Sequence, residues 1–242
     1  MRCYHFRVVD SSQDINNKSI NNLSRNSPIA LVVGAAGFIG SYICERLITH
    51  NIQVIGVDDF STGDKENISS LIKLRRFILL STNVENLNLD LPRLDYIYLT
   101  ASDASIESLL NFSKQFKPKM VFLSWIDLYD HKKSSQFRAA KDTEVILAKF
   151  SKERNLNARV VRLAPVWGPR MNFRVDDPII RLISAALDEN LQQESVSLEF
   201  SSRSLYIDDA VSLIIKSMMA GSTAWKIFDG VSPTPIKASE IK

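Results

Sequence analysis

Residues 29–40, which read IALVVGAAGFIG, decide the fold of this chain. The five apolar residues at the start predict a buried β-strand, and Gly34, Gly37 and Gly40 predict a tight turn that leads into a helix. Glycines let the backbone approach a pyrophosphate, and the positive end of the following helix favours its negative charge. The stretch therefore indicates a turn that holds the phosphates of a dinucleotide.

A second apolar run, residues 54–57, ends at Asp58, at the distance from the glycines that is typical of such a site. A carboxylate at this place accepts hydrogen bonds from the adenosine ribose and repels a phosphate on its 2′-oxygen. The glycines alone would be a weak signal, because loops between strands and helices are often glycine-rich. The order of strand, turn, helix, strand and acid predicts NAD as the cofactor, in preference to NADP.

The spacing Gly-x-x-Gly-x-x-Gly resembles the first turn of the extended short-chain dehydrogenase/reductases, the NAD-dependent epimerases and dehydratases of nucleotide sugars. Residues 58–63, DDFSTG, resemble the acid and following loop of that family. Residues 168–171, GPRM, and 203–211, RSLYIDDAV, resemble late motifs most familiar in UDP-glucuronate decarboxylases and dTDP-glucose dehydratases. The resemblance runs from about Ile29 to the end of the chain and implies a nucleotide-sugar-like small molecule as substrate.

The bulk composition narrows the class of protein. A chain of 242 residues with 45% hydrophobic and 24% charged residues is ordinary for a globular protein with one substantial core. A net charge of +3 is too small to argue for nucleic acid, and two cysteines give no disulfide framework. There is no apolar run of about 18 residues and no apolar signal core, so we expect no membrane partner and a cytoplasmic location.

The alternation of predicted strands and helices along the chain indicates an α/β fold. We expect a Rossmann-like doubly wound parallel sheet with a small, truncated C-terminal substrate lobe. We expect a flexible extension over residues 1–28, with a partner-binding arm as the alternative. The NAD-binding Rossmann domain is expected over 29–167. A reduced substrate-binding lobe, interleaved with that domain, is expected over 168–242.

Strands alternate with helices in this prediction. The expected strands are Ile29–Val33, Val54–Asp58, Phe77–Leu80, Tyr96–Thr100, Met120–Ser124 and Arg159–Leu163. The expected helices are Phe38–His50, Ile106–Phe116 and Lys141–Arg154, and, after Gly168, Pro178–Leu191 and Asp208–Ala220 with a strand over Ser195–Phe200.

The resemblance also implies which residues bind the cofactor. They are Gly34, Gly37, Phe38, Ile39, Gly40, Asp58, Asp59, Asn83, Val84, Ala101 and Lys141. Asn83 stands where the family usually has an Asp that receives the adenine amino group. An amide oxygen accepts such a bond, and the alternative is a polar residue that merely ends a strand. Ala101 and Ser102 resemble the small residues beneath the pyrophosphate, and no metal site is expected.

The chemistry of the family needs a Ser or Thr just beyond the fifth strand and a Tyr-x-x-x-Lys pair on the next helix. The Lys holds the nicotinamide ribose and lowers the pKa of the Tyr, which moves a proton while hydride passes. Here Trp125 takes the Ser position and Phe137 takes the Tyr position, and Ser124, just before Trp125, is kept as a catalytic candidate. Lys141 is retained, in a register fixed to within about a residue. Neither an indole nor a phenyl ring replaces the missing acid–base groups.

A literal Tyr-x-x-x-Lys occurs at Tyr129 and Lys133, several residues before that helix register. It is either a relocated catalytic pair or a coincidence in a charged loop. Pro165 stands where the family commonly has an Asn that contacts the sugar nucleotide. Arg203 matches the family's diphosphate-binding Arg, and its alternative is a surface Arg that pairs with an aspartate at 208 or 209.

Two functions remain open. One is an NAD-binding protein of this family with weak or no turnover, which the changes at Trp125, Phe137 and Pro165 favour. The alternative is an active nucleotide-sugar epimerase, dehydratase or decarboxylase whose catalytic groups are relocated to Tyr129, with a lysine at 133 or 141. Family members commonly dimerise through the helix after the fourth strand and the Tyr-Lys helix. Because Ile106–Phe116 is short, we expect a monomer or a non-standard dimer.

Overall fold

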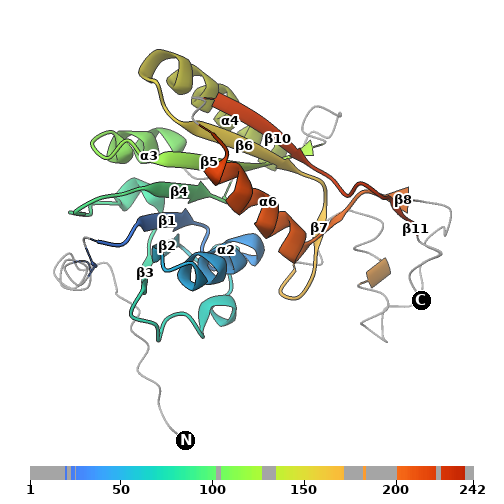
Figure 1. Cartoon of the computed structure of the whole chain (residues 1–242), viewed down its shortest axis with the longest axis horizontal. Helices are drawn as coiled ribbons and strands as arrows, with labels where there is room; N and C mark the ends of the chain where they lie inside the picture. Colours follow the sequence, from blue (N-terminus) through green and yellow to red (C-terminus); the bar gives the residue numbers. More distant parts are fainter. Residues whose placement is uncertain are drawn as a thin grey trace, which may run out of the picture.

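A seven-stranded parallel sheet forms the centre of the computed structural model, in the order β10-β6-β5-β4-β1-β2-β3 (Figure 1). The structure describes residues 20, 23–24, 26–101, 105–126, 135–171, 182–183, 201–221 and 225–237. The strands are β1 (Ile29–Val33), β2 (Gln53–Asp58), β3 (Phe77–Ser81), β4 (Tyr96–Leu99), β5 (Lys119–Trp125), β6 (Ala158–Leu163) and β10 (Trp225–Gly230). The predicted Rossmann-like α/β fold is confirmed.

The six predicted strands are all present, each within one residue of its expected ends. They form because short runs of apolar residues are covered on both faces, and β1 and β2 are buried at every position. The seventh strand, β10, was not expected. Its sequence mixes exposed charged residues such as Lys226 and Asp229 with apolar ones, and its parallel pairing with β6 places it at the edge of the sheet.

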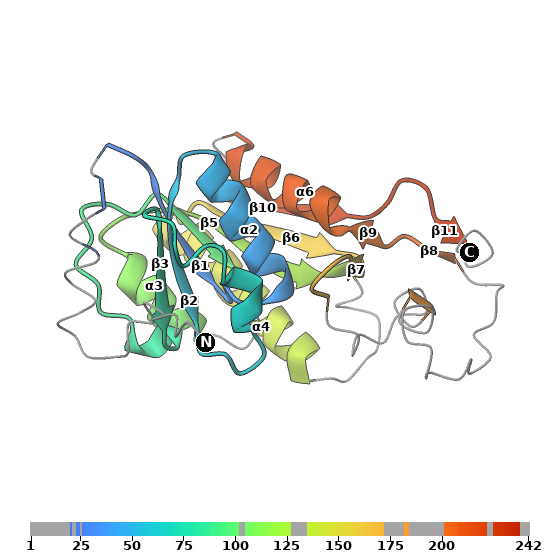
Figure 2. The ribbon, with the colours of Figure 1, turned by 90° about the horizontal axis from the view of Figure 1, so that it is seen from below.

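Helices cover both faces of the sheet (Figures 1 and 2). They are α2 (Phe38–Thr49), α3 (Ile106–Ser113), α4 (Ser135–Arg154) and α6 (Ile207–Met219), with short 3₁₀ turns η1 (Lys65–Ile68) and η2 (Val84–Asn86). Alternate residues of a strand point to opposite faces. Ala30 and Val32 therefore pack with α2 and α6, whereas Leu31 and Val33 pack with α3 and α4.

The helices differ from their predictions mainly at their ends. Helix α3 ends at Ser113, before the expected Phe116, and α4 begins at Ser135, ahead of Lys141. Helices α2 and α6 match within one residue. The predicted helix over 178–191 and strand over 195–200 lie outside the described residues, apart from 182–183, which are helical.

Two short strand pairs join distant segments. β7 (Val166–Trp167) runs parallel to β9 (Leu205–Tyr206), and β8 (Ser201–Ser202) runs antiparallel to β11 (Ile236–Lys237). Helix α6 and strand β10 come from the second part of the chain, yet they complete a helical layer and the main sheet. The two parts are therefore interleaved, while the proposed division into domains stays a prediction.

Residues 1–28 were expected to form a flexible extension, but the described residues from Ile20 onward pack onto the folded core. Ile20 and Leu23 are buried against the core on the α3 and α4 side. The Gln53 side chain accepts a hydrogen bond from the Ser24 N–H at 2.6 Å and donates to the Ser24 carbonyl at 2.8 Å. Within the part of the chain that the structure describes, no helix combines the length and apolar character needed to cross a membrane.

Candidate functional site

The glycine turn connects β1 to α2 and depends on two of its glycines for different reasons. Gly34 has a left-handed backbone with φ of +80°, and its N–H donates to the Val57 carbonyl of β2 at 2.9 Å. A Cβ on Gly40 would lie 1.9 Å from the Gly34 carbonyl oxygen, so only glycine allows this approach. No side chain caps the start of α2. The turn thus presents the positive end of a helix beside bare backbone, which suits an anion.

Asp58 ends β2 directly beside this turn. Its side chain is buried, with one carboxylate oxygen accepting from the Ala36 N–H at 2.8 Å and the other from the Phe60 N–H at 2.8 Å. Burial raises the pKa of this carboxyl group, and the two N–H bonds offset part of that rise. Each oxygen retains acceptor capacity. Gly63 leaves room for the carboxylate, because a Cβ there would lie 2.7 Å from it.

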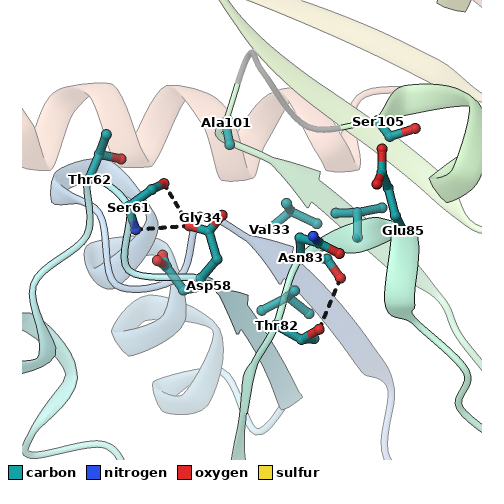
Figure 3. Close-up of a pocket in the computed structure, with 13 residues that line it drawn as sticks. Val33, Gly34, Asp58, Ser61, Thr62, Thr82, Asn83, Glu85, Ala101 and Ser105 are labelled. Atoms are coloured by element: carbon teal, nitrogen blue, oxygen red, sulfur yellow. Dashed lines mark hydrogen bonds between the residues drawn. The ribbon is translucent and has the colours of Figure 1, made fainter. Parts of the chain in front are cut away.

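A cavity of about 230 Å³ opens beside Asp58 (Figure 3). It is lined by Val33, Gly34, Val57, Asp58, Asp59, Ser61, Thr62, Thr82, Asn83, Val84, Glu85, Ala101 and Ser105. These residues belong to the carboxyl ends of β1 to β4 and the segments that follow them. The strand order reverses between β1 and β4, and ligands of open α/β sheets bind at such switch points.

The wall after β3 contains Asn83, whose side-chain oxygen accepts from the Asn86 N–H at 3.2 Å and so caps η2. Asn83 therefore caps the turn after β3, which agrees with the alternative of a polar residue at the end of a strand, and it also lines the cavity. Val84 is buried beneath this wall, and Glu85 is exposed. After β4, the Thr100 hydroxyl donates to the Val33 carbonyl at 2.8 Å and holds the start of the turn, and the next residue, Ala101, lines the cavity.

Asp59 lies at the rim of the cavity. Its carboxylate accepts from the Ser61 hydroxyl at 2.6 Å and from the Ser61 N–H at 2.9 Å. These bonds lower the pKa of Asp59, so this group stays charged in mildly acidic solution. The structure thus brings together six of the predicted cofactor residues, namely Gly34, Asp58, Asp59, Asn83, Val84 and Ala101. Gly37, Phe38, Ile39 and Gly40 form the adjoining turn and first helical turn.

Comparison with known proteins finds similarity to the same family that the sequence motifs resemble. The sequence model of the NAD dependent epimerase/dehydratase family matches residues 30–120. UDP-glucuronic acid decarboxylase 3 of Arabidopsis thaliana is 24% identical over 80% of this chain and 67% of its own length. UDP-glucuronic acid decarboxylase 1 of Xenopus tropicalis is 26% identical over 78% of this chain and 52% of its own length. The chain thus spans about half to two thirds of these relatives.

Solved structures share the fold. UDP-glucuronic acid 4-epimerase from Bacillus cereus, solved with NAD, has a TM-score of 0.74 and 22% identity. The alignment covers 88% of this chain and 80% of that one. UDP-glucose 4-epimerase from Thermotoga maritima has a TM-score of 0.72 and 23% identity, with the same coverage.

Over residues 30–120 the chain is therefore similar to the NAD dependent epimerase/dehydratase family. The sequence prediction places the family's catalytic serine position at Trp125, which is the last residue of β5. Ser124 is buried there, and its hydroxyl has no hydrogen-bond partner among the described residues. Trp125 follows it and packs against the core on the α3 and α4 side. In the predicted register, an indole takes the place of that hydroxyl.

The predicted register places the positions of the family's Tyr-Lys pair on α4. Lys141 is exposed on this helix, whereas Ala140 and Glu144 are buried against the sheet. Lys141 is not among the described residues that line the cavity. Phe137 lies in α4, but its side chain falls outside the description. The predicted candidates Tyr129 and Lys133 also lie outside the described residues.

Arg203, the predicted substrate residue, is exposed and is not among the described residues that line the cavity. Its guanidinium donates to the carbonyl oxygens of Ser232 at 3.3 Å and Pro233 at 3.4 Å. Asp208, one alternative partner, pairs with Arg46 of α2 at 3.3 Å. The Arg203 side chain therefore holds the segment before β11 in place.

Arg170 belongs to the GPRM motif at residues 168–171, but the sequence predicted no role for its side chain. Its guanidinium donates to Glu45 at 2.7 Å and to the Ser41 hydroxyl at 3.3 Å, and it lies over the Tyr42 ring at 4.6 Å. The Tyr42 hydroxyl in turn donates to the Pro169 carbonyl at 3.3 Å. These contacts fix the GPRM segment to the helix that begins at the glycine turn.

Proposed function

We propose that this chain binds NAD or NADH in the cavity beside Asp58. The observation that carries the proposal is the position of the cavity, at the switch point of the sheet between the glycine turn and the buried acid. Two structural neighbours, UDP-glucuronic acid 4-epimerase and a dTDP-glucose 4,6-dehydratase from Bacillus anthracis, were solved with NAD. Their likeness supports the same class of ligand here.

The residues fit a dinucleotide. The space that a Cβ of Gly34 or Gly40 would fill is taken up by backbone and by the Thr100 hydroxyl, so the turn keeps its tight form beside the start of α2. The backbone N–H groups there bind a pyrophosphate, and Asp58 accepts from the ribose hydroxyls. A bound nicotinamide dinucleotide supplies hydride transfer.

We further propose that turnover on nucleotide sugars is weak or absent. Trp125 occupies the position of the catalytic hydroxyl, and Phe137 that of the catalytic tyrosine, so the chain lacks a proton-transferring group at either. General acid–base help is typically worth about 10²–10⁴-fold in rate. Pro165 offers no side-chain hydrogen bond to a sugar nucleotide, and its carbonyl accepts from the Leu205 N–H at 2.8 Å.

Calorimetric titration tests the binding proposal. We expect NAD and NADH to bind more tightly than NADP, because Asp58 repels a 2′-phosphate. Asp58→Ala should weaken NAD by at least about tenfold, which corresponds to 1.4 kcal/mol. Equal or tighter binding of NADP would contradict the assignment of Asp58. Absence of binding for both would contradict the cofactor proposal itself.

Turnover is tested with a panel of UDP- and dTDP-sugars, by cofactor reduction and product formation. We expect no reaction, or rates far below those of family members assayed alongside. Rates similar to theirs would refute the proposal and favour relocated catalytic groups. Tyr129→Phe would then show whether that tyrosine transfers the proton.

A further inference from the structure

A second cavity, of about 250 Å³, lies at the edge of the sheet opposite to Asp58. The turn from α3 into β5 contributes Lys117 and Pro118 to its lining, and the turn from α4 into β6 contributes Asn155 and Leu156. These turns lead into the amino ends of two strands, whereas the proposed NAD site lies at the carboxyl ends. Because the strands are parallel, the two cavities are separate, and an inference about the second one does not depend on the proposed function.

Four residues of its lining are apolar, and together we call them the apolar wall. Leu110 of α3 and Pro118 are buried, while Phe150 of α4 and Leu156 are half-buried. The apolar wall removes the apolar surface of a ligand from water, which is favourable. Cavities for drug-sized ligands measure about 300–1,000 Å³, so this smaller one suits a molecule of about one ring.

Three cations line the same cavity, and no carboxylate is among its described lining residues. The cations are Lys114, Lys117 and Arg154, and all three are exposed. The ion pairs found among the described residues involve other cations. The Arg154 guanidinium lies over the Phe150 ring, 4.4 Å from its centroid, so a positive charge stands directly beside the apolar wall.

Cations near the end of a helix often satisfy its last carbonyl groups, but here other donors do so. The Asn111 carbonyl accepts from the Lys114 N–H at 3.4 Å, and the Ser113 carbonyl accepts from the Lys117 N–H at 3.2 Å. The Leu110 carbonyl accepts from the Ser113 hydroxyl at 3.1 Å. Lys117 also has a left-handed backbone with φ of +51°, where glycine is the usual residue. The end of α3 therefore does not account for the two lysine side chains.

We propose that the second cavity binds a small organic acid, whose apolar body packs on the apolar wall and whose anionic group faces the three cations. An ammonium group donates up to three hydrogen bonds, and a guanidinium binds a carboxylate or a phosphate through two. A neutral ring would leave these cations unused, and an inorganic anion would leave the apolar wall exposed. The ligand is therefore an acid with an apolar part of about one ring.

Calorimetric titration of the full chain with four probes tests the proposal. Phenyl phosphate and phenylacetate carry both features, whereas benzyl alcohol lacks the charge and inorganic phosphate lacks the ring. We expect at least one of the two acids to bind about tenfold more tightly than both controls. The acid that binds more tightly identifies the anionic group as a phosphate or a carboxylate. Failure of both acids to exceed the two controls would overturn the inference.

Lys114→Gln combined with Lys117→Gln removes two of the cations at exposed positions. We expect this double variant to bind the acid about three- to tenfold more weakly, because exposed charge pairs are individually weak, and to bind benzyl alcohol unchanged. Lys149→Gln combined with Lys152→Gln removes the same charge from exposed positions of α4 outside the lining and should bind like the wild type. Equal losses in the two double variants would show an effect of net charge only and would contradict the proposal.

The glycine turn is a second place where an anionic probe could bind, so the titrations are repeated with saturating NAD. Distant sites act nearly independently, and we expect the affinity for the acid to change by less than about twofold. Displacement of the acid by NAD, with wild-type affinity in the Lys114 and Lys117 double variant, would place the acid at the glycine turn and overturn the inference. If NAD itself does not bind, the proposed function fails, while the two double variants still test the second cavity.

Discussion

Gly40 and Gly221 show how much the surroundings of a single residue matter. A Cβ on Gly40 would lie 1.9 Å from the Gly34 carbonyl oxygen, whereas a Cβ on Gly221 would meet nothing within 4 Å. We expect Gly40→Ala to lower the free energy of unfolding by about 1–3 kcal/mol, because the backbone of the turn must move. The same variant should lose measurable NAD binding.

Gly221→Ala is the matched control and should change the free energy of unfolding by less than about 0.5 kcal/mol. Denaturant unfolding and NAD titration of both variants provide the measurements. Wild-type NAD affinity in Gly40→Ala would show that the turn tolerates a side chain and is no phosphate site.

The buried carboxyl group of Asp58 gives a second prediction at the residue scale. Because burial raises its pKa, Asp58 takes up a proton at a less acidic pH than an ordinary aspartate. The ionised form is the better acceptor for ribose hydroxyls, so on acidification NAD affinity should begin to fall at a higher pH than an ordinary aspartate would give. Asp58→Asn cannot ionise and should bind more weakly at pH 7, with a flatter pH profile.

Titrations of both proteins at several pH values measure this difference. Asp59 is a poor alternative source of the effect, since its hydrogen bonds to Ser61 lower its pKa. Parallel pH profiles for the wild type and Asp58→Asn would contradict the prediction.

At the scale of elements, a buried ion pair attaches α4 to the sheet. The Arg162 guanidinium of β6 donates to both carboxylate oxygens of Glu144, at 3.1 and 2.6 Å, and Glu144 is only 4% exposed. Breaking such a pair by removing one charge is costly, so Glu144→Gln should lower the free energy of unfolding by about 3 kcal/mol. Glu153→Gln, at an exposed site of the same helix, should have little effect.

A double variant distinguishes the contribution of the ion pair to stability from the contribution of packing. Glu144→Met combined with Arg162→Met should recover part of the lost stability, because apolar side chains of similar volume replace both charges and avoid the cost of taking them out of water. Denaturant unfolding of the single and double variants measures it. Additive losses in the double variant would show that the two side chains act independently.

At the scale of the whole molecule, the outer faces of α3 and α4 argue against the family's usual dimer. Helix α3 has eight residues, which span about 12 Å. The exposed positions of α4 include Lys141, Lys149 and Lys152. A stable interface buries about 800 Å² per partner, and a short helix beside a row of lysines is a poor surface for that.

We therefore predict a monomer, or a dimer formed through another surface. Light scattering at micromolar concentration measures the mass. Val145 is 60% exposed near the middle of α4, so Val145→Glu would break an interface at this face. A dimer that dissociates in this variant would show that the prediction is wrong.

The sequence by itself determined the Rossmann-like sheet and, within the proposed cofactor site, the glycine turn and the acid that follows β2. Residues 29–40 and Asp58 act through their neighbours in the chain: buried apolar runs form strands, and glycines at a fixed spacing close the turn. Such signals are local, so they survive without knowledge of the rest of the fold. The confirmed strands and the gathering of Gly34, Asp58 and Ala101 around one cavity follow from them.

Only the tertiary structure decided which distant segments meet and which way each side chain of a helix faces. Strand β10 owes its place to pairing with β6, and Arg170 meets Glu45 across 125 positions of sequence. The register of α4 was open by about a residue, and one residue turns a side chain by about 100°. Ala140 is buried and Lys141, one residue later, is exposed. What a helical side chain can reach depends on the direction in which it faces, and the residue type alone does not reveal that direction.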